Sequence, residues 1–79
     1  MSSYKGVKMI LKKVENNMVV SAAEIKSFHV EIDDNNKATI TVILDDLNNS
    51  EKVYDQAPGD HHLYQIIDNN NNILRLIHQ

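Results

Sequence analysis

The last twenty residues, DHHLYQIIDNNNNILRLIHQ (residues 60–79), decide whether this chain is an α+β or an all-β domain. Their apolar residues recur at helical spacing, and Asp60 is a suitable N-cap directly after Pro58 and Gly59. Four consecutive asparagines oppose a helix, because each costs roughly 0.6 kcal/mol relative to alanine in a helix interior. The alternative is a hairpin in which the asparagines form the turn between two strands.

The sequence before this tail predicts an antiparallel sheet of four to five strands. Its clearest hairpin covers residues 28–44, where apolar and polar residues alternate on both sides of the polar turn 34–37. Such alternation is typical of strands with one buried face and one wet face. Further strands are predicted at residues 7–12, 18–20 and 51–56.

A short helical turn is predicted near residues 21–26. Ser21 and Glu24 have the spacing of a capping box, in which each side chain satisfies a free amide of the first helical turn. We expect the tail to be helical as well, because a single-layer sheet needs a second layer to cover its apolar face. The expected fold is therefore α+β: one antiparallel sheet, the helical turn, and a C-terminal helix packed on one face. The alternative is an all-β small barrel or sandwich with a C-terminal hairpin.

Composition indicates one small globular domain spanning residues 1–79. The chain is 42% hydrophobic and 24% charged, which lies within the ordinary globular range. It has no cysteine, so it can form neither a disulfide framework nor a thiolate metal site. We therefore expect a soluble cytoplasmic protein, since no stretch approaches the roughly 20 apolar residues that span a bilayer.

No combination of residues predicts an active site, a metal centre or a cofactor. Asp60, His61 and His62 at the end of a loop are the best candidates for a weak metal or catalytic role. Adjacent histidines point apart in regular structure, and no cysteine completes a zinc pattern. No serine lies in a glycine-flanked elbow, and the two glycines form no phosphate-binding loop. We expect a protein that is not an enzyme.

Two kinds of binding surface remain as hypotheses. The first is a mixed apolar and polar patch on the wet face of the sheet, which would bind a protein partner or a second copy of the chain. Its predicted residues are Lys8, Ile10, Lys12, Thr39, Thr41, Ile43 and Tyr54. The alternative is a nucleic-acid surface formed by the N-terminal lysine strip, which consists of Lys5, Lys8, Lys12 and Lys13.

The small size and the lack of a site motif look generically like those of small accessory proteins of phages and mobile elements. This likeness implies a protein that inhibits a larger host protein by occluding part of its surface. It rests on size and style and not on a shared motif, so it assigns no role to any residue.

Overall fold

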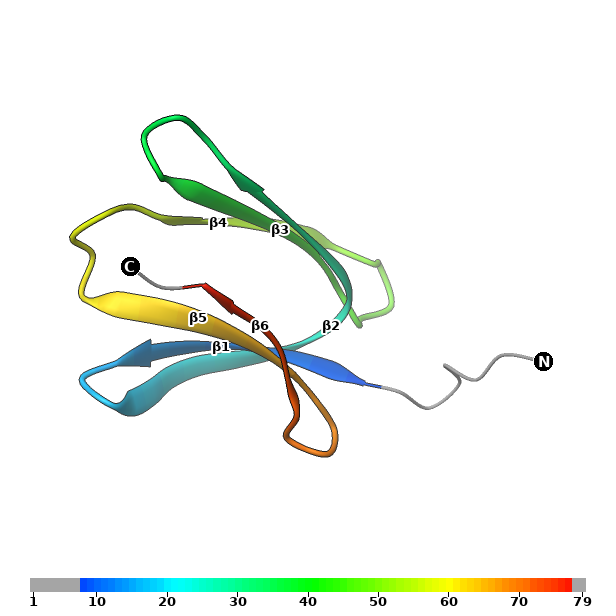
Figure 1. Ribbon diagram of the computed structural model, residues 1–79. Coiled ribbons are helices and arrows are strands. Elements are labelled where there is room, and N and C mark those ends of the chain that lie inside the picture. Colours follow the sequence, from blue (N-terminus) through cyan, green and yellow to red (C-terminus); the bar gives the residue numbers. More distant parts are fainter. Residues whose placement is uncertain (1–7, 78–79) are drawn as a thin grey trace.

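A computed structural model describes residues 8–77, which form one six-stranded antiparallel sheet (Figure 1). The strands are β1 (Met9–Glu15), β2 (Met18–Ile32), β3 (Ala38–Leu44), β4 (Glu51–Gln56), β5 (His62–Asp68) and β6 (Ile73–Ile77). Their order across the sheet is β4-β3-β2-β1-β5-β6, so the β1–β5 ladder joins strands that are distant in sequence. Residues 8–77 contain no helix that is long and apolar enough to cross a membrane.

The expected C-terminal helix is wrong, and the all-β alternative fits the structure. Residues 62–77 form the β5–β6 hairpin, and the asparagine run makes its turn. The Asp68 carboxylate accepts hydrogen bonds from the backbone amides of Asn70 and Asn72, at 2.8 and 2.9 Å. Asn71 adopts a φ of 65°, a conformation that asparagine tolerates better than most residues. These turn interactions favour the hairpin, whereas the asparagines would weaken a helix.

The expected helical turn at residues 21–26 is also wrong, because this segment lies inside the 15-residue strand β2. Ser21 pairs with Lys13 and Glu24 pairs with Ile10 on β1. Pairing with β1 gives residues 21–25 a continuous ladder along one edge, whereas an isolated helical turn is marginal in water. The register shifts between Lys13 and Val14, which leaves Val20 as the extra residue of a β-bulge.

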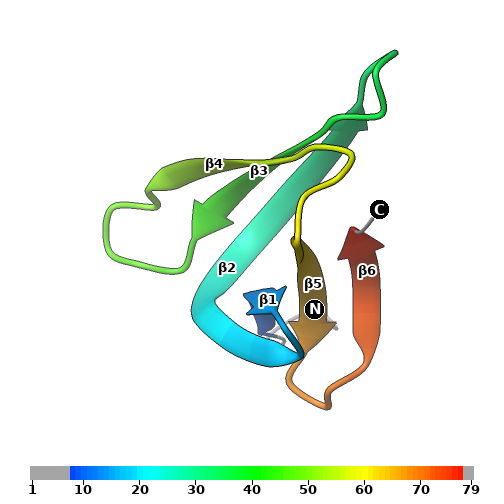
Figure 2. The ribbon, with the colours of Figure 1, turned by 90° about the vertical axis from the view of Figure 1, so that its left-hand side faces the viewer.

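The sheet covers its own apolar face, which is why the fold needs no helix. Residues 18–25 of β2 pair with β1, and most of its later residues pair with β3. β2 bends between these two parts, so that β1, β5 and β6 lie on one side and β3 and β4 on the other (Figure 2). We call these the β1 half and the β3 half. The core between them contains Leu11, Ile25, Ala38, Ile40, Val42, Tyr64, Ile66 and Ile77.

The hairpin predicted for residues 28–44 is confirmed, and its turn belongs to a type that occurs three times. Each turn begins with an aspartate whose Oδ1 accepts hydrogen bonds from the backbone amides two and four residues later. The fourth residue is always an asparagine with positive φ. The aspartates are Asp33, Asp46 and Asp68, and the asparagines are Asn36, Asn49 and Asn71.

Candidate protein-binding surface

The outer face of the β1 half carries a row of isoleucines. Ile10 pairs with Ile67, and Ile67 pairs with Ile73 on the edge strand β6. Their chain neighbours Leu11 and Ile66 are buried in the core, at 4% and 0% exposure. Because successive side chains of a strand point to opposite faces, the isoleucine row points away from the core.

Further apolar residues continue this row across the same face. Val14 pairs with both Val19 and Leu63. Val20 is the extra residue of a β-bulge next to Val19, and Leu74 is the extra residue of a second bulge next to Ile73. We define the apolar face as Ile10, Val14, Val19, Val20, Ala22, Leu63, Ile67, Ile73, Leu74 and Leu76. Ile67 is only 5% exposed although it lies outside the core cluster, so neighbouring side chains of the face shield it.

The two outer strands of the apolar face are open to solvent, whereas Ile10, Val14 and Leu63 between them are half-buried. Five of its side chains expose between 43% and 57% of their surface. They are Val19, Val20, Ile73, Leu74 and Leu76. They lie on β2 and β6, the two outer strands of this half, with the apolar residues of β1 and β5 between them. Extended apolar patches on a monomer are often functional.

One cation lies within the apolar face. Lys12 pairs with Ala22 on one side and with Gln65 on the other, so it occupies the middle of the four strands. The nearby Lys8 ammonium lies 4.0 Å from the Glu24 carboxylate, and this exposed pair contributes little stability. Among residues 8–77, no salt bridge involves Lys12. The face is therefore apolar with a single unpaired positive charge near its centre.

The outer face of the β3 half is polar by comparison. Cross-strand pairing there forms the rows Glu31–Thr39–Asp55, His29–Thr41–Val53 and Ser27–Ile43–Glu51. Val53 and Ile43 are its only apolar side chains among these rows, and they lie next to carboxylates or hydroxyl groups. This half has the alternation expected for a solvated sheet face.

The structure divides the patch that the sequence predicts. Lys8, Ile10 and Lys12 lie on the outer face of the β1 half. Thr39, Thr41 and Ile43 lie on the β3 half, with β2 between the two groups.

Tyr54, the last residue of the predicted patch, does not lie on the wet face. It pairs with the fully buried Ile40 and packs against the core cluster. Its ring centroid is 5.5 Å from that of Tyr64. Burial raises the pKa of the Tyr64 hydroxyl, and the nearby Tyr54 adds to this effect. Both tyrosines therefore belong to the interior.

The sequence contains a signal for the apolar face that is missed when strands are recognised only by alternating apolar and polar residues. Consecutive apolar pairs occur within strands, as in Val19-Val20, Ile66-Ile67 and Leu76-Ile77. A strand with such pairs presents apolar side chains on both faces, as strands covered on both sides do.

The residues considered for metal binding do not assemble into a metal site. The Nε2 atom of His62 lies 3.7 Å from Oδ2 of Asp60, and His61 is exposed. Within residues 8–77, no group of three or more potential metal-ligating side chains comes together. Asp60 instead accepts a 2.8 Å hydrogen bond from the backbone amide of Ala57, so it shapes the loop between β4 and β5.

The lysine strip does not share one face either. Lys8 and Lys12 point outward, whereas Lys13 pairs with the buried Tyr64 and its ammonium lies 3.9 Å from the Glu15 carboxylate. Lys5 lies outside the described residues. Of the predicted strip, Lys12 is therefore the described lysine that remains unpaired on the outer face.

These features define a small all-β domain, built from one curled antiparallel sheet with an uncovered apolar outer face. Comparison of the chain with protein-family models, curated proteins and solved structures finds no match. The surface itself is therefore the basis for the function proposed next.

Proposed function

We propose that this chain is a small non-enzymatic protein-binding module that docks a partner protein on its apolar face. The observation that carries the proposal is the exposed isoleucine and leucine surface around Ile73, which no described segment covers. Burying such surface against a partner contributes roughly 25 cal/mol per Å² before the costs of association.

The charge on the face favours a different protein over a second copy as the occupant. A two-fold dimer centred on this face would bring its two Lys12 ammonium groups close together. A different protein can offer a carboxylate opposite Lys12 within an otherwise apolar surface. A domain of 79 residues can then act by occluding that part of its partner, which is the mode of action expected of an accessory protein that inhibits a host protein.

Matched substitutions on the two outer faces test this proposal. Ile73→Asp places a charge on the apolar face, and Lys12→Glu reverses the charge at its centre. Val53→Asp is the control, because Val53 is 56% exposed on the polar face and Ile73 is 57% exposed. Tagged wild-type protein is used to capture partners from a lysate of the source cells, and the captured protein is purified and titrated against each variant.

We expect one purified partner to bind wild type and Val53→Asp equally, and to lose about tenfold or more in affinity for Ile73→Asp and Lys12→Glu. Light scattering of the pure chain should show a monomer. A dimer that Ile73→Asp dissociates would instead show that the occupant is a second copy. Equal partner binding by all four proteins would exclude the apolar face as the docking surface.

A further inference from the structure

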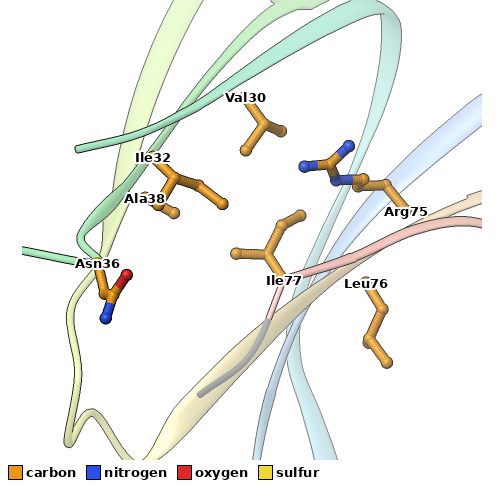
Figure 3. A pocket seen from close by; sticks show the side chains of 7 residues that line it. All are labelled: Val30, Ile32, Asn36, Ala38, Arg75, Leu76 and Ile77. Atoms are coloured by element: carbon orange, nitrogen blue, oxygen red, sulfur yellow. The ribbon is translucent and has the colours of Figure 1, made fainter. Parts of the chain in front are cut away.

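A groove lies between β6 and the C-terminal part of β2, and its lining residues are Val30, Ile32, Asn36, Ala38, Arg75, Leu76 and Ile77 (Figure 3). Its volume is about 250 Å³, and Val30, Ala38 and Ile77 form its aliphatic lining. Ala38 and Ile77 are buried, at 3% and 6% exposure, whereas Ile32 at the rim is 60% exposed. The groove thus has a buried apolar floor and an open mouth.

Among residues 8–77, two strand edges that border the groove have no neighbouring strand. Residues 27–32 of β2 pair with β3 on one side, and β6 pairs with β5. The Cα atoms of β2 and β6 are more than 8 Å apart at nearly every position. Hydrogen-bonded strands lie about 4.8 Å apart, so one more strand needs edges separated by roughly twice that distance, and the separation of more than 8 Å agrees with this requirement.

Arg75 gives the groove its charge. It pairs with the fully buried Ile66, so it lies on the inner side of β6, and its side chain extends toward Val30 (Figure 3). Among the residues that the structure describes, none forms a salt bridge with Arg75. A guanidinium beside aliphatic side chains favours a ligand that brings a carboxylate together with apolar groups.

We propose that this groove binds an extended peptide segment of a partner protein, which adds as a strand between β2 and β6 and places an acidic side chain against Arg75. The two free edges supply backbone hydrogen bonds, and the aliphatic floor accepts alternate side chains of the peptide. The sequence class is an acidic residue with an aliphatic residue two positions before and after it. The groove and the apolar face meet at Leu76 on β6, but this proposal does not depend on docking on the apolar face.

Three capped seven-residue peptides of alternating threonine and valine serve as probes. Their central residue, on the same side as the valines, is aspartate, asparagine or lysine. Amide NMR titration of the full chain measures the affinity, and hydrogen exchange locates the bound strand. The variants are Arg75→Gln, Arg75→Lys and Val19→Asp, which changes the apolar face on β2 away from β6, with Lys52→Gln on β4 as the control for loss of one positive charge.

We expect the aspartate peptide to bind about tenfold more tightly than the lysine peptide and to protect amides in residues 27–32 and 73–77. Arg75→Gln should remove this preference, whereas Arg75→Lys, Lys52→Gln and Val19→Asp should retain it. Retention by Val19→Asp distinguishes the groove from the apolar face.

Three results would overturn the proposal. The first is equal affinity for all three peptides, or no binding of the aspartate peptide at about 1 mM, where even weak strand addition is measurable. The second is protection along β4 instead of β2 and β6. The third is an Arg75→Gln variant that self-associates while its peptide preference is unchanged. Arg75 would then only prevent the sheet edge from pairing with other chains.

Discussion

The side-chain amide of Gln56 donates a 2.7 Å hydrogen bond to the carbonyl oxygen of His62, from the end of β4 to the start of β5. Gln56 is completely buried, and β4 and β5 are not neighbours in the sheet. This bond therefore joins the β3 half to the β1 half at the point where the chain passes between them.

Replacing Gln56 with alanine should lower the free energy of unfolding by about 2–4 kcal/mol, because the change leaves a cavity and a buried carbonyl without its donor. Urea unfolding measures the loss. Asp55→Ala, one residue earlier, should cost less than about 0.5 kcal/mol, since its 3.8 Å ion pair with Lys37 is exposed. Similar losses in the two variants would show that the Gln56 bond does not hold the halves together.

Stability should fall in acid because of two turn aspartates. The backbone amide of Ser50 lowers the pKa of Asp46, and that of Asn72 lowers the pKa of Asp68, each below the ordinary 3.8. Since the unfolded chain takes up these protons first, the stabilising contribution is complete above pH 3.8 and disappears as the pH falls through the lowered values.

The double variant Asp46→Asn and Asp68→Asn should therefore lose less stability on acidification than wild type does. Thermal unfolding followed from neutral pH to about pH 2 tests this expectation. Asp34→Asn is the control, because Asp34 accepts no side-chain hydrogen bond among the described residues. The explanation fails if the double variant and the control show the same acid dependence as wild type.

The positive φ of Asn71 should make this position sensitive to a Cβ. Asn71→Ala should cost about 1 kcal/mol, whereas Asn71→Gly should change stability by less than about 0.5 kcal/mol. Asn69→Ala in the same turn has no positive φ and should be nearly neutral. Denaturant midpoints compare the three variants, and an equal cost for both alanine variants would contradict the backbone explanation.

Tyr54 and Ile43 should behave differently, although both belong to the patch predicted from sequence. Tyr54→Ala removes a half-buried ring that packs against the core and should cost about 2 kcal/mol of stability. Ile43→Asp lies on the polar face and should leave partner affinity unchanged, in contrast to Ile73→Asp. Calorimetric unfolding measures the stability of Tyr54→Ala, and partner titration measures the affinity of Ile43→Asp. Weaker partner binding by a folded Ile43→Asp variant would support the patch predicted from sequence.

Period-two alternation predicts the hairpin of residues 28–44 correctly, because one face of that hairpin is buried and the other is wet. The same method fails for residues 62–77, where Ile66 and Ile67 are both buried on opposite faces of one strand. Such apolar pairs fit helical spacing as well as strand spacing. The asparagine run distinguishes the two, because it favours a turn, whereas the second layer that favoured a helix is supplied by the curled sheet itself.

The candidate site is harder to predict because it depends on long-range pairing. Ile10 and Ile67 become neighbours through the β1–β5 ladder, which no local pattern encodes. Likewise, the bend in β2 separates Ile10 from Ile43 although both are outward-facing apolar residues.

The strand order also has a consequence for the folding pathway. The other four ladders join strands that follow one another in the chain, so they can form as local hairpins. The β1–β5 ladder must close a much longer loop, with a larger entropic cost, and we expect it to be rate-limiting. Because β6 reaches the groove only after β5 has paired with β1, a partially folded chain has no peptide site, and strand addition would select the fully folded molecule.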